Sequence, residues 1–173
     1  MNAPTTRVAT PDDAAAIGAI HVRTWQAAYR GVMPQEYLDG LDSASRAAGW
    51  QRLLSAPPPG DTTLVAEVDG RVVGFANVGP SRDEDATDGE GEVRAIYVDP
   101  DSWDSGAGRE LMIAGLARLT ESGLRHAILW VLVGNERARR FYEAGGWRAD
   151  GAVKDEESFG VQVSELRYRR PLT

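Results

Sequence analysis

Residues 92–123 constrain the fold more than any other stretch of the chain. They begin with the alternating, partly β-branched residues EVRAIYV, which predict a strand over residues 92–98. Asp99-Pro100 ends this strand, because proline biases the residue before it away from helical geometry. After a loop, Arg109 is predicted to open a helix. Its apolar stripe at i, i+4 and i+7 is Met112, Leu116 and Leu119.

Gly106 and Gly108 lie in the loop between this strand and this helix. A glycine-containing turn before a helix directs unpaired backbone N–H groups and the positive end of the helix dipole toward one point. Such a turn suits a phosphate group, although many turns of this kind are only tight turns. The spacing differs from the dinucleotide-binding fingerprint, and no lysine stands where a P-loop needs one.

The other predicted elements complete a single domain over residues 1–173. Residues 126–133 form a nearly continuous apolar run, as in strands that are covered on both faces. The helix between this strand and residues 92–98 predicts a right-handed crossover and parallel neighbours. We therefore expect the α/β class, with a mixed, twisted sheet and helices on both faces. Further helices are predicted at residues 10–29, 34–41, 43–54 and 135–145, and further strands at residues 63–68, 71–78, 147–153 and 161–169.

Two connections carry recognisable signals. Asp69-Gly70 suits a two-residue hairpin turn, because both positions tolerate positive φ. Residues 81–91 form a polar, acidic stretch, and its simplest interpretation is a solvated loop.

The composition excludes several classes of protein and site. The chain has no cysteine, which excludes disulfides, thiolate metal sites and a cysteine nucleophile, and which fits a reducing compartment. A net charge of −7 disfavours nucleic acid as a partner. No apolar run approaches the roughly 20 residues that span a bilayer, and the first residues show no apolar signal core. We therefore expect no membrane association and a cytoplasmic location.

His21 and His126 have no partner at metal-ligand spacing, so we expect no metal site.

Two motifs, EVRAIYVDPxxWxxGxG and NERARRFYEAGGW, resemble the GNAT-type N-acetyltransferase superfamily. The resemblance is good over residues 92–147, and the order of elements agrees over nearly the whole chain. The segment WQAAYRGVMPQEYL, residues 25–38, is similar to the substrate-side segment of members that act on small molecules. The resemblance implies acetyl-CoA as donor and a primary amine of a small molecule as acceptor, with direct transfer in a ternary complex.

The family's phosphate-binding signature corresponds to six consecutive residues, Trp103, Asp104, Ser105, Gly106, Ala107 and Gly108. Both glycines match, but Trp103 replaces a basic or amide residue and Asp104 stands where glycine is frequent. A carboxylate near a pyrophosphate is repulsive, so Asp104 must point outward or binding is weakened. Arg109 is one cation that could offset it.

Other cofactor contacts follow from the same resemblance. The later part of the first strand, Ile96, Tyr97 and Val98, is expected to pair with the pantetheine after a local distortion, and the Val98 N–H to act as an oxyanion donor. Asn135 matches an asparagine that contacts the cofactor, and it can equally serve as a helix cap. Arg139 and Arg140 are candidates for phosphate contacts or for a solvated helix face.

Glu92 and Tyr142 are the candidate catalytic residues. Glu92 occupies the position of a glutamate base in histone-type members, and a base is needed because a free alkylamine is mostly protonated at neutral pH. Glu67 and the acids at residues 83–90 are its rivals. Tyr142 matches the tyrosine that lies near the CoA sulfur and could protonate the departing thiolate, with a core aromatic on an apolar helix face as the alternative.

Trp25 and Tyr29 are expected to wall the acceptor pocket, with core packing as the alternative. Protein N-terminal or lysine acetylation is an alternative activity, and a non-catalytic acyl-CoA-binding regulatory module is an alternative from another class. The sequence leaves open the acceptor, the acyl length and whether the last strands pair between two chains in a homodimer.

Overall fold

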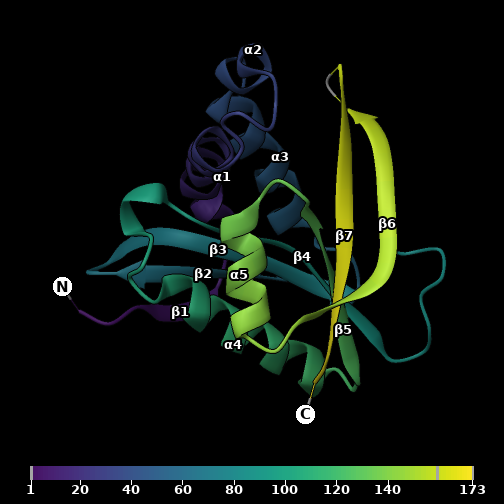
Figure 1. Cartoon of the computed structure of the whole chain (residues 1–173). Helices are drawn as coiled ribbons and strands as arrows, with labels where there is room; N and C mark the ends of the chain where they lie inside the picture. Colours follow the sequence, from purple (N-terminus) through teal and green to yellow (C-terminus); the bar gives the residue numbers. More distant parts are fainter. Residues whose placement is uncertain (1, 159, 173) are drawn as a thin grey trace.

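The computed structural model describes residues 2–158 and 160–172 as helices on both sides of a seven-stranded sheet with the order β1-β2-β3-β4-β5-β7-β6 (Figure 1). The strands are β1 (Thr5–Val8), β2 (Thr62–Val68), β3 (Arg71–Pro80), β4 (Glu90–Val98), β5 (His126–Leu132), β6 (Arg148–Ser158) and β7 (Val161–Pro171). The helices are the 3-10 turns η1 (Pro11–Asp13) and η2 (Pro100–Ser102), and α1 (Ala14–Ala28), α2 (Gln35–Asp39), α3 (Ser43–Ser55), α4 (Ala107–Glu121) and α5 (Glu136–Ala144).

Strands β4 and β5 are parallel, and each of the other neighbouring pairs is antiparallel. This mixed sheet confirms the predicted α/β class. Strand β1 was not predicted, because its four residues are too short to show a clear period. It is the edge partner of β2.

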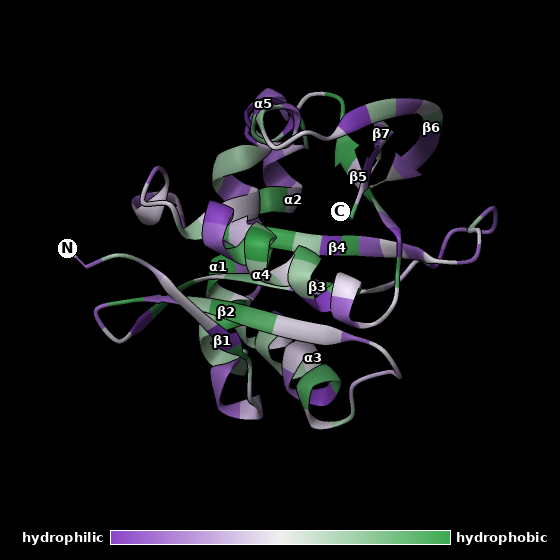
Figure 2. Cartoon of the chain, turned by 90° about the horizontal axis from the view of Figure 1, so that it is seen from below, coloured by the Kyte–Doolittle hydropathy of each residue, from purple (hydrophilic) through white to green (hydrophobic). Residues whose placement is uncertain are grey.

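Side chains that alternate along the strands build two cores, one on each face of the sheet. On β2, Val65 packs in one cluster with Ile17 and Ile20 of α1. Leu64 and Ala66 pack in the opposite cluster with Leu111 of α4. Figure 1 accordingly shows α1 and α3 on one side of the sheet and α4 on the other, and Figure 2 shows hydrophobic residues concentrated where strands and helices meet.

Several local predictions are confirmed. Asp69 and Gly70 have φ values of 52° and 76°, as a two-residue hairpin turn with positive φ at both positions requires. Thr10 caps η1 reciprocally with Asp13, and the Asn135 side chain accepts a hydrogen bond from the Ala138 N–H at the start of α5.

Two predictions need correction. Helix α4 begins at Ala107 and not at Arg109, because Gly106 adopts the left-handed conformation with φ 90° and thereby serves as its N-cap. Residues 81–91 are not simply a solvated loop, since the side chain of Asp83 is only 8% exposed and is held by strand residues. In the described part of the chain, no helix is both long and apolar enough to cross a membrane.

Candidate active site

The site lies where β4 and β5 separate. The two strands pair in parallel from Glu90 opposite His126 to Glu92 opposite Ile128, yet β4 continues to Val98 and β5 to Leu132 without further pairing in the described structure. A cavity of about 640 Å³ occupies this opening and reaches the turn before α4 and the inner face of α5. It brings together most of the predicted site residues: Tyr29, Ile96, Tyr97, Val98, Trp103, Asp104, Gly106, Ala107, Gly108, Arg109, Asn135 and Tyr142.

The backbone of β4 is left unpaired on its cavity side. The Asp99 N–H donates to the Val73 carbonyl of β3 at 2.8 Å, and the register pairs Tyr97 with Phe75. Because successive residues of a strand direct their polar groups to opposite sides, Tyr97 also bonds toward β3. The backbone N–H groups of Ile96 and Val98 therefore point into the opening.

The distortion of β4 lies nearer the start of the strand than the sequence predicted. The register shifts between the pairs Asn77–Ala95 and Val78–Val93, which makes Arg94 the extra residue of a bulge. The prediction had placed the distortion at residues 96–98. The Arg94 side chain is almost buried and forms an ion pair of 2.9 Å with Asp61. The bulge therefore interrupts the regular alternation of side chains along β4 at this residue.

The turn before α4 is built around two residues with left-handed backbone. Asp104 has φ 66° and Gly106 has φ 90°. Positive φ at residue 104 is the physical reason why glycine suits this position, and aspartate is among the side chains that tolerate it best. Gly108 faces the cavity, where a Cβ would meet Phe141 and Val98 at 3.6 Å. Ser105 does not line the cavity, although its hydroxyl accepts a hydrogen bond from the Ala107 N–H.

Arg137 of α5 supplies a cation to this turn, which sequence reasoning missed. Its guanidinium carbon lies 4.2 Å from the centre of the Trp103 ring, and its Nη2 lies 3.3 Å from Oδ1 of Asp104. The Asp104 side chain is 88% exposed, so it points outward as required. The partner of Asp104 is thus Arg137 and not the predicted Arg109.

Helix α5 presents Tyr142 to the cavity. The residue is buried within the main core, and burial raises the pKa of its hydroxyl well above the ordinary value of 10.0. A phenol with a raised pKa stays protonated at neutral pH and can donate a hydrogen bond. Its neighbour Phe141 also lines the cavity, and it is 38% exposed.

Glu92 lies at the closed end of the opening, on the last pair of the β4–β5 ladder. It does not line the cavity, and its Oε1 accepts a hydrogen bond from the Arg82 N–H at 3.1 Å. No ion pair involves Glu92 among the described residues, whereas four of its six predicted rivals are paired. Glu67 binds Arg7, Asp83 and Asp85 bind Arg167, and Glu90 binds Arg169 and His126.

An aromatic cluster forms the wall of the cavity on the α1 side. Tyr29 lines the cavity and meets Trp25 edge-to-face, with ring centres 4.9 Å apart. Trp25 packs behind it and does not itself line the cavity. His21 lies 5.4 Å from Tyr97 by ring centres, and burial together with Arg46 lowers the pKa of His21 to about 4. The histidine is therefore neutral at physiological pH.

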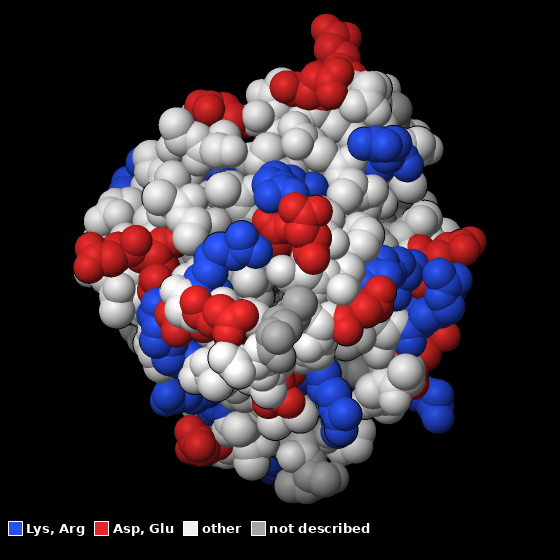
Figure 3. Space-filling model, turned by 90° about the vertical axis from the view of Figure 1, so that its left-hand side faces the viewer, with Lys and Arg blue, Asp and Glu red and all other residues white. Residues whose placement is uncertain are grey.

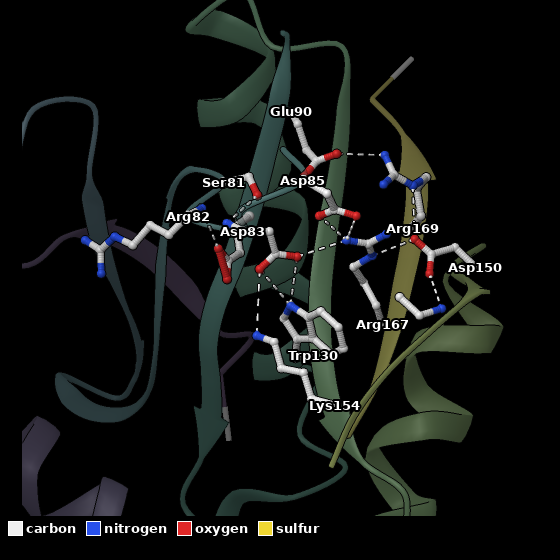
Figure 4. Close-up of polar contacts among 12 residues, drawn as sticks. Ser81, Arg82, Asp83, Asp85, Glu90, Trp130, Asp150, Lys154, Arg167 and Arg169 are labelled. Atoms are coloured by element: carbon white, nitrogen blue, oxygen red, sulfur yellow. Dashed lines mark hydrogen bonds and ion pairs between the residues drawn. The ribbon is translucent and has the colours of Figure 1, made fainter. Parts of the chain in front are cut away.

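An ion cluster centred on the buried Arg167 ties the loop between β3 and β4 to strand β7 (Figure 4). Arg167, 9% exposed, pairs with Asp83, Asp85 and Asp150 at 3.1, 2.8 and 2.7 Å. Asp83 also accepts a hydrogen bond from Nε1 of Trp130, a cavity-lining residue. The loop is thereby fixed against one wall of the site.

Charges are mixed over the surface beside β1 and the N-terminus, where Figure 3 shows acidic and basic side chains interspersed. The net charge of −7 is therefore not gathered into a single patch on this face. Among the described residues, no group of three or more His, Asp or Glu side chains could hold a metal ion.

Known proteins share both the sequence and the fold. Residues 17–147 match the model of the acetyltransferase (GNAT) family. The chain is 30% identical over 164 residues to the N-acetyltransferase YuaI of Bacillus subtilis, covering 94% of this chain and 90% of that protein. It is 33% identical over 173 residues to a phosphinothricin N-acetyltransferase of Alcaligenes faecalis, covering 97% and 82%.

A solved structure with this fold is the PaiA N-acetyltransferase of Thermoplasma acidophilum in complex with coenzyme A. Its TM-score is 0.75 at 16% identity, and the match covers 98% of this chain and 99% of that one. YncA of Salmonella typhimurium with acetyl-CoA has a TM-score of 0.73 at 22% identity, covering 99% and 95%.

Proposed function

This chain belongs to the GNAT family of acetyltransferases, and from that membership we propose that it transfers an acetyl group from acetyl-CoA to the primary amine of a small molecule. The family makes it an acyltransferase that uses acetyl-CoA. The observation that carries the proposal is the separation of β4 from β5 over a cavity that also meets the turn before α4.

The cavity fits an acyl-CoA in two respects. Unpaired N–H groups of Ile96 and Val98 offer a strand edge to the amide groups of a pantetheine. The backbone amides of residues 105–109, at the N-terminal end of the 15-residue helix α4, offer a positive dipole end to a pyrophosphate. We assign Arg137 and Asn135 to the same ligand, since both line the cavity.

The bound donor supplies an acetyl group that is activated as a thioester. Glu92, directly or through a water, takes the proton that the acceptor ammonium must lose before it attacks. The Val98 N–H stabilises the developing oxyanion, and the Tyr142 hydroxyl gives a proton or hydrogen bond to the departing sulfur. The chain has no cysteine, so the acetyl group passes directly to the amine without a cysteinyl intermediate.

A small acceptor is supported by the walls on its side of the cavity. Tyr29 and Trp130 line it, and the loop that Arg167 fixes backs Trp130 through Asp83. The 33% identical relative is named for acetylation of phosphinothricin, a small molecule. We therefore favour a small molecule over a protein N-terminus or a lysine side chain.

The test is to incubate the chain with acetyl-CoA and separate polyamines, aminoglycosides, amino acids and lysine peptides, and to follow free thiol. We expect thiol release with a small amine and only background release with peptides. Release with peptides alone would favour protein acetylation. Calorimetric binding of CoA without release in any mixture would favour a regulatory acyl-CoA-binding module.

A further inference from the structure

Glu165 of β7 lies on the face of the sheet that borders the acceptor side of the cavity. Its neighbours at i−2 and i+2, Val163 and Arg167, share its face because side chains alternate along a strand. Val163 packs in one cluster with Tyr29, and Arg167 lies 5.5 Å from the centre of the Trp130 ring. Tyr29 and Trp130 both line the cavity. Glu165 therefore lies on the same face as residues that pack near Tyr29 and Trp130, although it does not itself line the cavity.

No ion pair within 4.0 Å neutralises Glu165 in the described structure, although the charge of Lys154 partly offsets the rise that burial causes in the pKa of Glu165. Its cross-strand neighbour is Lys154, but the Lys154 ammonium lies 4.0 Å from the centre of the Trp130 ring and 3.8 Å from Asp83. Arg167, the other cation on this face, is held by three aspartates. Among the described residues, no hydrogen bond or ion pair within 4.0 Å reaches the Glu165 side chain. A partly buried carboxylate without a partner is unfavourable unless a ligand supplies the missing charge.

The charge of Glu165 is a lesser contribution, after burial, to the raised pKa of two tyrosines that line the cavity, Tyr29 and Tyr97. Burial raises the pKa of Glu165, and its charge contributes to raising the pKa of Tyr29 and Tyr97. The pKa of Tyr142, by contrast, is raised by burial and by Tyr97. These effects agree with a position of Glu165 on β7 beside the cluster that contains Val163 and Tyr29.

We propose that Glu165 binds a second cationic group of the acceptor, so that the acceptor is a diamine or polyamine with one amine at the acetyl group and another at Glu165. The inference rests on the proposed function. Aromatic side chains beside a carboxylate favour an organic ammonium, because ring faces attract cations. The ring of Tyr29 lines the cavity on this side, whereas Lys154 already covers the ring of Trp130, and Glu165 provides the charge. Glu165 here determines specificity and is distinct from the proposed base, Glu92.

The experiment compares putrescine with butylamine, which differ by one terminal amine, as acceptors for the full chain with acetyl-CoA. We expect wild-type kcat/KM to be at least about tenfold higher for putrescine, as a charged hydrogen bond provides. Glu165→Gln should remove most of that preference and leave butylamine within about twofold, whereas Glu165→Asp should keep most of it. Glu121→Gln is the matched control, because Glu121 is an exposed carboxylate at the end of α4, away from strand β7.

An unchanged putrescine preference in Glu165→Gln, or an equal loss for both amines, would overturn the inference. Equal wild-type kcat/KM for the two amines would also overturn it. Calorimetry of putrescine binding to the CoA-loaded chain and to its Glu165→Gln variant separates the two proposals. Binding that depends on Glu165 without thiol release would contradict the acetyl transfer alone, and thiol release that ignores Glu165 would contradict this inference alone.

Discussion

The guanidinium group of Arg137 stacks on the ring of Trp103, with 4.2 Å between the guanidinium carbon and the ring centre. Trp103 stands at the start of the proposed phosphate-binding turn, at the position where the family's signature is expected to have a basic or amide side chain. Arg137 comes from α5, across the mouth of the cavity. The positive charge is therefore present at this turn although it comes from a different element, and Asp104 holds it in place with an ion pair of 3.3 Å.

Removing the charge of Arg137 and removing the charge of Asp104 should change the affinity for CoA in opposite directions. Arg137→Ala is expected to weaken CoA binding about five- to tenfold, because a cation near the pyrophosphate is lost. Asp104→Asn is expected to strengthen it by a few-fold, since it removes a repulsive carboxylate and frees Arg137. Isothermal calorimetry measures both. Arg118→Ala, on an exposed residue near the other end of α4, should leave the affinity unchanged. Equal affinities for all four proteins would refute this placement of the phosphates.

Tyr142→Phe should reduce turnover strongly and leave acetyl-CoA affinity nearly intact. The variant keeps the buried ring and removes the hydroxyl that is proposed to protonate the thiolate, a contribution of about a hundredfold for a general acid. Steady-state kinetics and calorimetry separate the two quantities. The matched control is Tyr168→Phe, which loses a hydrogen bond of 2.7 Å to Glu143 in the same core and should keep normal turnover. Normal turnover in Tyr142→Phe would rule out the assigned role.

Glu92→Gln should lower the rate most at low pH. There the amine is mostly protonated and most needs a base, whereas at high pH free amine is available without help. The pH dependence of kcat/KM measures this. Glu67→Gln is the control, because Glu67 is paired with Arg7 at 2.8 Å near the sheet edge formed by β1 and β2. A Glu92→Gln profile parallel to that of the wild type would remove Glu92 from the mechanism.

Local patterns predicted the fold well where neighbouring residues decide the conformation. The β4–turn–α4 unit, the Asp69-Gly70 hairpin and the Asn135 cap are examples, because their signals lie within a few residues. The start of α4 was wrong by two residues, since a left-handed Gly106 can end a loop earlier than the helical pattern suggests. The short edge strand β1 has too few residues for a period.

Contacts between distant residues could not be predicted in this way. Arg137 reaches Asp104 across 33 positions, and Arg167 reaches Asp85 across 82. No spacing rule links such residues, because their proximity depends on how the sheet brings β5, β7 and the β3–β4 loop together. The same limit explains why the acidic loop was interpreted as solvated, and why Glu165 could not be identified.

Arg167→Met should destabilise the chain by about 3 kcal/mol, because it leaves the buried Asp83 carboxylate without its main partner. Urea unfolding followed by circular dichroism measures the loss. Arg140→Ala is the control: Arg140 is 73% exposed and pairs with Glu136 at 3.7 Å, so its removal should change the free energy of unfolding by less than about 1 kcal/mol. Similar losses in the two variants would show that the cluster does not fix the loop.

The stability of the chain should fall between pH 7 and pH 5 because of His21. Its pKa is about 4 in the folded state, below its ordinary value of 6.5, because of burial and of Arg46. As the pH falls below 6.5, His21 binds a proton in the unfolded chain but not in the folded chain. The free energy of unfolding therefore decreases between pH 6.5 and pH 4. The ring is partly exposed, and we therefore expect a loss of only about 1 kcal/mol at pH 5.

His21→Gln keeps an acceptor for the Trp50 N–H and should reduce the difference in stability between pH 7 and pH 5 by that amount. Trp50→Phe removes the hydrogen bond of 3.2 Å that Nδ1 accepts, and because only the neutral ring can accept it, the variant should lose less stability at pH 5 than at pH 7. Urea midpoints and slopes at the two pH values measure these differences, and an undiminished pH effect in His21→Gln would assign the titration to another group.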